Sequence, residues 1–216
     1  MTSRSDISRR LVVLGIAAGG LSLCRVRTLR AACALTPGQA EGPFFPVTQA
    51  LESDLDLTQI AGRPRAEGQV IEVSGRVLDG GCRPQAGVVI EVWQANARGR
   101  YDHPRDRQNA APLDPNFQGY ARLISDAEGG YRIRTIKPAA YPVTADWWRP
   151  PHIHFKIQAQ GLAPLTTQLY FAGEELNGKD RLLGPMPEDQ RRRLEVALAP
   201  GGADNLPRGQ FDLVLA

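Results

Sequence analysis

Residues 70–78 read VIEVSGRVL and residues 88–93 read VVIEVW, and these two stretches decide the fold class. Both are short, rich in β-branched side chains and partly alternating, a pattern typical of strands that bury one face. The glycine pair at residues 80–81 and Pro84 lie between them and supply the residue types that a chain reversal needs. The sequence therefore predicts a hairpin-like pair of strands here.

The same kind of run recurs through the rest of the chain, separated by turn residues. Short strands at this spacing predict an all-β domain, a two-sheet β-sandwich with long connecting loops. One short C-terminal helix is expected within residues 187–197, because acidic residues come early and Leu194 and Leu198 fall on one side. The further strands are predicted at residues 121–124, 131–134, 152–157, 167–171 and 211–215.

The charge of the chain is unevenly distributed. Its 216 residues suit one domain with a sizeable core, and the formal net charge is +3. Residues 1–33 hold six arginines and one aspartate, so removing them takes Lys+Arg from 26 to 20 and Asp+Glu from 23 to 22, a body of about −2. The only dense basic run of that body, residues 191–193, is interpreted as a solvated helix face. We therefore expect no nucleic-acid partner.

The first thirty-three residues look like a targeting segment. Residues 8–14 read SRRLVVL, an apolar run follows to residue 23, and small residues surround Cys33, a layout that resembles a twin-arginine export signal. We predict a signal over residues 1–33 and a mature domain over residues 34–216. The expected location is the periplasm, or the cytoplasm if the leader is not used. The alternative is an N-terminal helix of the mature domain. The three arginines after the apolar run weaken the export interpretation, because positive charge is unusual at that place in a signal.

The three cysteines indicate no disulfide framework and no Cys-x-x-Cys metal site. Cys24 and Cys33 lie in the predicted leader, so Cys82 is expected to stand alone. We interpret Cys82 as a structural or incidental residue of a turn-like segment.

The chain has only three histidines, and two of them, His152 and His154, are separated by a single residue. In a strand, residues i and i+2 point to the same face, so both imidazoles can reach one point. This spacing favours a metal site, although zinc, copper and iron all accept imidazole. A structural role for both histidines is the other reading.

Two of the five tyrosines, Tyr101 and Tyr141, follow predicted strands and are expected in loops. A phenol titrates near ~10 in water, so it binds as phenolate only beside a strong Lewis acid. Phenolate is a hard anionic donor that favours Fe(III) over Fe(II). Considered alone, either tyrosine is more typical of a packed or interfacial aromatic residue.

Several ordered motifs stand out along the chain. Residues 112–117 read PLDPNF, residues 135–142 read TIKPAAYP, residues 148–155 read WRPPHIHF and residues 167–171 read TQLYF. Together they resemble the signature of the intradiol ring-cleavage dioxygenases, most closely subunits of the protocatechuate 3,4-dioxygenase type. The resemblance covers roughly residues 35–175.

The resemblance implies a site in which two tyrosines and two histidines hold one non-haem Fe(III). It also implies cleavage of a catechol-type ring (protocatechuate, catechol or a substituted diol) with O2 to a cis,cis-muconate, without an external reductant. Tyr141 would be the tyrosinate that leaves when substrate binds, Arg149 would stabilise negative charge on the ring, Gln168 would orient a neighbour, and Trp93 would pack behind the site. The metal ligands are expected to be Tyr101, Tyr141, His152 and His154.

Other functions stay open on the sequence. One is an iron- or catechol-binding β-sandwich without turnover, another a purely structural transthyretin-like or immunoglobulin-like module, and the third a copper or zinc protein. The joint presence of both tyrosines, both histidines, Arg149 and Gln168 argues against the last two.

The sequence leaves the substrate and the assembly undecided. Residues 143–145 read VTA where relatives of the protocatechuate type often carry a bulky aromatic residue. A substrate carboxylate would need a cationic or hydroxyl partner, for which Arg98, Arg100 and Arg105 are candidates. The expected partners are a small aromatic diol and O2, and the chain is expected to form a homo-oligomer or a hetero-oligomer with a related subunit.

Overall fold

The structure, a computed structural model, describes residues 32–47, 55–201 and 203–216. The predicted export signal lies outside them, apart from its last two positions. The described strands are β1 (Val70–Asp79), β2 (Val89–Gln94), β3 (Tyr120–Ile124), β4 (Gly130–Ile136), β5 (Tyr141–Thr144), β6 (Trp147–Arg149), β7 (His152–Gln158), β8 (Leu165–Phe171), β9 (Glu195–Val196), β10 (Arg208–Gln210) and β11 (Leu213–Leu215). The helical elements are the 3-10 turns η1 (Pro104–Asp106) and η2 (Glu175–Gly178) and the helix α1 (Glu188–Arg191).

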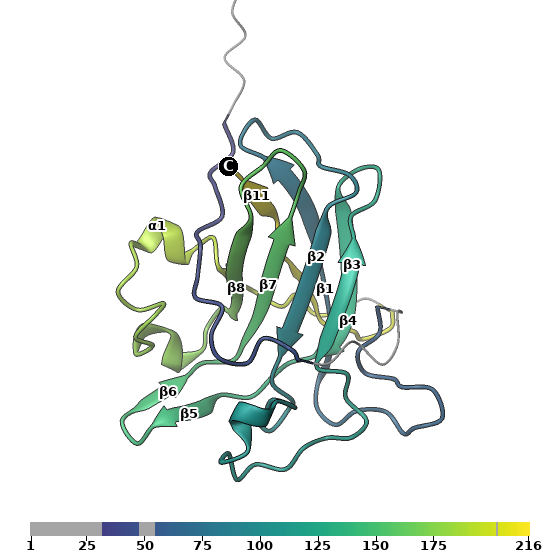
Figure 1. The fold of residues 1–216 in the computed structure, drawn as a ribbon, viewed down its shortest axis with the longest axis vertical. Coiled ribbons are helices and arrows are strands. Elements are labelled where there is room, and N and C mark those ends of the chain that lie inside the picture. The colour runs from purple at the N-terminus through teal and green to yellow at the C-terminus, as the bar shows by residue number, and fades with distance from the viewer. Residues whose placement is uncertain (1–31, 48–54, 202) are drawn as a thin grey trace, which may run out of the picture. The chain divides into compact units, whose positions relative to one another are not determined.

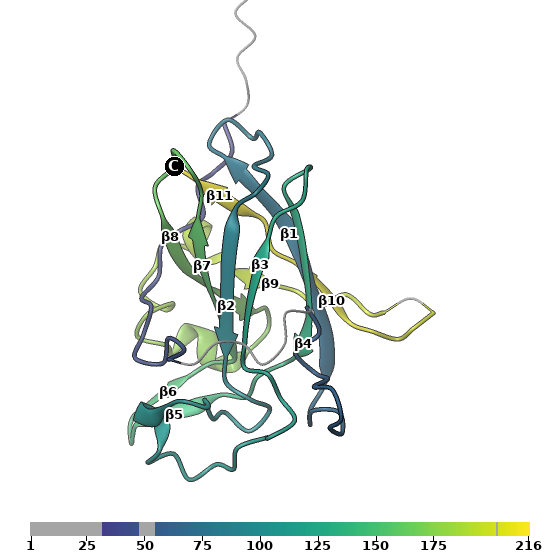
Figure 2. The ribbon, with the colours of Figure 1, turned by 45° about the vertical axis from the view of Figure 1, so that its right-hand side comes forward.

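The strands form two layers, which confirms the all-β sandwich prediction (Figure 1). One sheet has the order β3-β2-β7-β8-β9. The other has the order β10-β1-β11, with β4 also paired to β1. Figure 2 separates this second layer from the first, and both views show the small β5–β6 hairpin below one end of the sheets.

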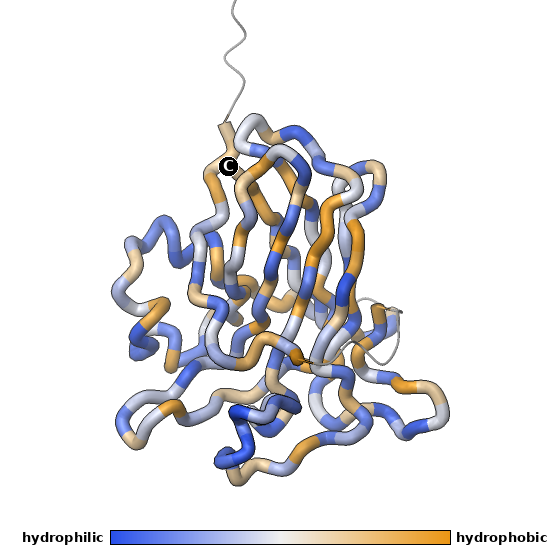
Figure 3. The backbone as a smooth tube through the Cα atoms, viewed as in Figure 1, coloured by the Kyte–Doolittle hydropathy of each residue, from blue (hydrophilic) through white to orange (hydrophobic). Residues whose placement is uncertain are grey.

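The core lies between the two sheets because alternate residues of each strand point inward. Ile71 and Val73 of β1 face Ile90 of β2 and Phe155 of β7, and all four side chains are fully buried. Along the strands this alternation is visible as blue and orange segments, whereas the segments around η1 and α1 are mostly hydrophilic (Figure 3). A second, separate aromatic cluster surrounds Trp93.

The predicted hairpin of residues 70–78 and 88–93 is wrong. β1 pairs with β4, β10 and β11, whereas β2 pairs with β3 and β7, so the intervening turn carries the chain from one sheet to the other. Alternation identifies the face of a strand that is buried, but not the strand beside it. For the same reason β3 and β4, which follow each other in the chain, belong to different sheets.

The C-terminal helix is shorter than predicted. α1 ends at Arg191, and Leu194 is fully buried where the chain enters β9. The backbone N–H of Tyr170 donates to Leu194 O at 2.8 Å, and β9 then pairs in parallel with β8. Pairing with the sheet edge therefore overrides the helical tendency of residues 192–197.

The expectation that Cys82 stands alone is wrong, since Cys33 and Cys82 form a disulfide with an S–S distance of 2.06 Å. It fixes the start of residues 33–47, here called the N-terminal strap, which runs along the sandwich. Thr36 N–H donates to Val214 O at 3.0 Å and Gln39 N–H to Thr166 O at 2.8 Å. The strap is thus tied to both sheets.

Cys82→Ser should lower the free energy of unfolding by about 2–4 kcal/mol, because the disulfide closes a long loop in the unfolded chain. Denaturant titration measures this. In reductant, the wild-type protein should have the same free energy of unfolding as the variant. Reductant should not change the free energy of unfolding of the variant. An equal midpoint for wild type and variant without reductant would contradict the prediction.

Candidate metal centre

Two imidazoles lie side by side on β7, the central strand of the five-stranded sheet. His152 and His154 are each 2% exposed. The cross-strand register places His154 opposite Trp93 on β2 and opposite Gln168 on β8. The Trp93 indole stacks on the His154 ring, with centroids 4.7 Å apart and planes 9° apart. Trp93 therefore supports one face of this imidazole.

The two imidazoles turn their Nε2 atoms toward each other, 3.2 Å apart. His152 Nδ1 lies 2.7 Å from Pro150 O, and because a carbonyl oxygen only accepts, Nδ1 carries the proton and Nε2 a lone pair. Burial, and after it the charge of Arg149, lowers the pKa of both histidines well below the usual value. Both rings are therefore neutral, the form in which imidazole binds a metal.

Tyr101 completes a compact group of three donor atoms. Its Oη lies 3.2 Å from His154 Nε2 and 3.4 Å from His152 Nε2. The side chain is 4% exposed, and the ring of Phe44 from the strap stacks on it at 4.6 Å. The Tyr101 backbone N–H donates to Asp106 Oδ2 at 2.7 Å, which anchors the loop after β2.

Tyr141 approaches the same group from a different element. The prediction that it lies in a loop is wrong: it is the first residue of β5 and pairs with Arg149 on β6. Its ring centroid lies 5.6 Å from those of Tyr101 and His152. Burial raises the pKa of both tyrosines, and the pKa of Tyr101 is raised further by Tyr141. Either phenolate therefore needs a cation beside it.

Gly99 allows the two tyrosine loops to meet. Its φ is +78°, and a Cβ at this position would lie 2.5 Å from Ala140 O and 3.2 Å from Tyr141 Cβ. A larger residue would force the loop that carries Tyr101 away from the start of β5.

Gly99→Ala should therefore lower the free energy of unfolding by about 1–3 kcal/mol more than Gly87→Ala, because the added methyl group overpacks against backbone. Gly87 has a similar φ of +71° but no atom within 4 Å of an added Cβ, so it reports the backbone strain alone. Denaturant titration of both variants measures the difference. Equal destabilisation would contradict the steric role of Gly99.

The donor set fits a metal ion. Two neutral imidazole nitrogens and a phenol oxygen converge within 3.2–3.4 Å in a buried site, and a second phenol adjoins them. Among the described residues, no group of three or more His, Cys, Asp or Glu side chains could hold a metal. The further donor beside the two imidazoles is instead the Tyr101 phenol oxygen. The third histidine, His103, lies apart and accepts the Arg105 N–H at 3.1 Å.

Arg149 is buried beside this cluster and is held from two sides. Its Nε donates to Asp180 Oδ2 at 2.8 Å, and its Nη2 donates to Gln168 Oε1 at 2.6 Å and to Tyr170 Oη at 3.1 Å. The Asp180 side chain is fully buried. Gln168 in turn donates to Ala40 O of the strap at 2.7 Å. Gln168 thus orients the arginine rather than a ligand histidine.

Sequence reasoning missed Asp180, Tyr170 and Phe44 as parts of this site. Asp180 lies 31 residues after Arg149 in an irregular segment, where no period or motif marks it. Only its burial and its contact with Arg149 identify it.

A cavity of about 850 Å³ opens beside the cluster, with Tyr141 and Arg149 in its wall. Most of the remaining wall is apolar, with Phe44 from the strap, Trp147 and Trp148 from β6, and Leu182. A planar aromatic ring in this cavity therefore has access to Tyr141 and Arg149, whereas Tyr101 lies behind Phe44.

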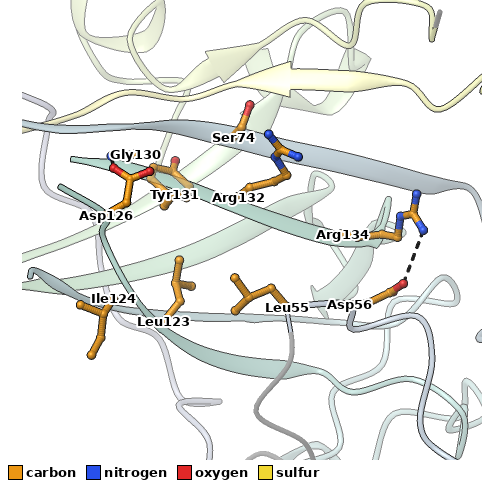
Figure 4. A pocket seen from close by; sticks show the side chains of 10 residues that line it. All are labelled: Leu55, Asp56, Ser74, Leu123, Ile124, Asp126, Gly130, Tyr131, Arg132 and Arg134. Atoms are coloured by element: carbon orange, nitrogen blue, oxygen red, sulfur yellow. Dashed lines mark hydrogen bonds and ion pairs between the residues drawn. The ribbon is translucent and has the colours of Figure 1, made fainter. Parts of the chain in front are cut away.

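A second cavity of about 700 Å³ lies between β3 and β4 (Figure 4). Arg134 there forms an ion pair with Asp56 at 3.6 Å, and the hydroxyl of its one tyrosine, Tyr131, donates to Phe211 O. Its described lining contains no histidine or cysteine, and Asp126 there accepts the backbone N–H groups of Glu128 and Gly130. This cavity offers no comparable chemistry.

Comparisons with known proteins agree with this geometry. The family model described as Dioxygenase matches residues 40–188. The chain is 45% identical over 177 residues to the protocatechuate 3,4-dioxygenase beta chain of Burkholderia cepacia, covering 75% of this chain and 71% of that one. It is 36% identical over 132 residues to chlorocatechol 1,2-dioxygenase of Pseudomonas sp. strain P51 but spans only about half of that relative's length (49%).

A solved structure shares the fold. The dioxygenase domain of a dioxygenase–carbohydrate-binding fusion from Streptomyces sp. SirexAA-E superposes with a TM-score of 0.63 at 34% identity. The match covers 84% of this chain and 98% of that domain.

Proposed function

This chain belongs to the intradiol ring-cleaving dioxygenases, and we propose that Tyr101, Tyr141, His152 and His154 hold one non-haem iron(III) at its active site. The chain is thus an oxidoreductase that cleaves catechol-type rings with O2. The observation that carries the metal assignment is the convergence of Tyr101 Oη with both Nε2 atoms at 3.2–3.4 Å. Two phenolates and two neutral imidazoles suit a hard trivalent ion.

The chemistry that iron(III) supplies in such a site is Lewis-acid activation of a bound catecholate. Tyr141 lines the cavity and, as a phenolate, accepts a proton from an incoming diol at its Oη. Burial raises the pKa of Tyr141 although Arg149 opposes the rise, so away from a metal the neutral phenol is the favoured form. Tyr101 is covered by Phe44 and stays in place.

Arg149 stabilises negative charge that develops on the ring. Its ion pair with Asp180 and its bonds to Gln168 and Tyr170 fix the guanidinium before substrate arrives, so no reorganisation is needed during the reaction. The apolar side chains of the wall, Phe44 and Trp147 among them, would exclude water from part of a bound ring. Such exclusion strengthens the electrostatic effect of the arginine.

An absorption experiment tests this function. Purified protein loaded with Fe(III) should show a broad visible band, which catechol should shift to longer wavelength under argon. Admitting air should then consume one O2 per diol. A protein that stays colourless after loading would overturn the metal site. A shift without O2 uptake would favour a catechol-binding protein without turnover.

We also propose export through a twin-arginine signal. The Cys33–Cys82 disulfide supports an oxidising compartment, where such bonds persist. It favours cleavage before Cys33 rather than after it, because only then does the mature chain keep the bond. None of the described helices is long and apolar enough to cross a membrane. Export would be contradicted if the full-length chain were found only in the cytoplasmic fraction, with Cys33 and Cys82 as free thiols.

The partners that we propose are a small aromatic diol, O2 and a related subunit. The similar Burkholderia protein is named as a beta chain, which supports a hetero-oligomer with a related subunit; a homo-oligomer is the alternative assembly. Light scattering of the protein expressed alone separates a self-assembling chain from one that needs a second subunit.

A further inference from the structure

Among the described residues that line the cavity, one cation has no neutralising partner. The sequence offers Arg98, Arg100 and Arg105 as partners for a charged ring substituent. Arg98 is committed to Glu67, with its Nε 2.8 Å and its Nη2 2.5 Å from Oε2. Arg100 Nη1 donates to Ala111 O at 2.7 Å. Arg105 alone of the three lines the cavity, and its side chain has no hydrogen bond or ion pair among the described residues.

The backbone of Arg105 is fixed relative to the metal centre. It lies in η1, four residues after Tyr101, and its N–H donates to His103 Nδ1 at 3.1 Å. The next residue, Asp106, accepts the Tyr101 N–H at 2.7 Å, and Asn109 Nδ2 donates to Gly99 O at 2.9 Å. The segment that carries Arg105 is thus tied to the loop that carries Tyr101, while the guanidinium itself stays uncommitted.

The other charges around the cavity are already balanced or occupied. Arg149 forms a buried ion pair with Asp180. Asp106 also lines the cavity, but its carboxylate accepts from the Tyr101 N–H and from Asn109 Nδ2. Arg105, which is exposed like Arg107, therefore leaves a positive charge beside a mostly apolar wall. A guanidinium in such surroundings binds a carboxylate with two parallel hydrogen bonds.

We infer that Arg105 is a specificity-determining residue that selects aromatic diols bearing a carboxylate on the ring. The inference rests on the proposed function, because the two hydroxyls must occupy the metal end of the cavity for the carboxylate to reach η1. A solvated surface arginine is the competing explanation. Arg107 provides the matched control, since it is exposed, two residues away and outside the cavity wall.

The test compares 3,4-dihydroxybenzoate with catechol in iron-loaded wild type, Arg105→Ala, Arg105→Lys and Arg107→Ala. Arg105→Ala should lower the ratio of kcat/KM for 3,4-dihydroxybenzoate to that for catechol by about 10- to 100-fold, chiefly through KM. Arg105→Lys should retain part of the preference, because lysine keeps the positive charge but cannot form the two parallel hydrogen bonds of a guanidinium. Arg107→Ala should leave the ratio unchanged.

Dissociation constants of the two diols, measured under argon, give the same comparison without turnover. An unchanged ratio in Arg105→Ala, or an equal fall in Arg107→Ala, would overturn the role of Arg105 while ring cleavage stands. Wild type that binds both diols with no preference would overturn it as well. Failure of every variant and of wild type to cleave any diol would instead reject the proposed function, and the binding ratio would still decide the role of Arg105.

Discussion

Replacing His154 by alanine should abolish ring cleavage and reduce iron affinity by more than about 100-fold, beyond the usual cost of losing a supporting residue. His154 Nε2 lies 3.2 Å from both His152 Nε2 and Tyr101 Oη, so its removal opens the centre of the donor group. The Trp93 indole, which stacks on the His154 ring, has no lone pair that could bind the metal in place of the imidazole. Iron per chain and the visible absorption band measure the loss.

His103→Ala is the control for this change. His103 is the third histidine and is also buried, but it accepts a backbone N–H of η1 instead of facing the cluster. It should retain iron and colour. Full iron content with an unaltered band in His154→Ala would remove His154 from the ligand set.

Arg149→Ala should keep the iron and the shift that a diol induces, yet lower kcat by about 10²- to 10³-fold, the usual cost of one preorganised charge-stabilising donor. Asp180, Gln168 and Tyr170 hold the Arg149 guanidinium in place. None of these three partners carries a positive charge, so none can replace the arginine in stabilising negative charge on the ring. Stopped-flow measurement of the anaerobic diol complex, followed by mixing with O2, separates binding from turnover.

The buried position of Asp180 complicates this variant. Without Arg149 its carboxylate stays fully buried and uncompensated, which should cost about 3–5 kcal/mol of folding stability. The double variant Arg149→Ala/Asp180→Ala should recover much of that stability and none of the activity. Normal turnover in a folded Arg149 variant would exclude the arginine from catalysis.

The buried ion pair also shows why part of the site cannot be predicted from short stretches of sequence. Arg149 stands in a recognisable run, WRPPHIHF, but Asp180 has no periodic or motif context. Asp180 reaches Arg149 only because the fold brings η2 and the following turn against β6. Phe44 is similar, since the strap reaches Tyr101 only because the disulfide and the bonds to β8 and β11 hold it there.

The sequence by itself determined the all-β class and the pairing of His152 with His154 on one face, because a strand repeats every two residues and that period is local. It also supplied four candidate ligands in ordered motifs. The tertiary structure alone decided that β1 and β2 belong to different sheets, that Cys33 bonds to Cys82, that Asp180 holds Arg149, and which arginine faces the cavity. The reason is physical: a local pattern specifies which face of an element is buried, whereas its partner depends on how distant segments share the remaining space.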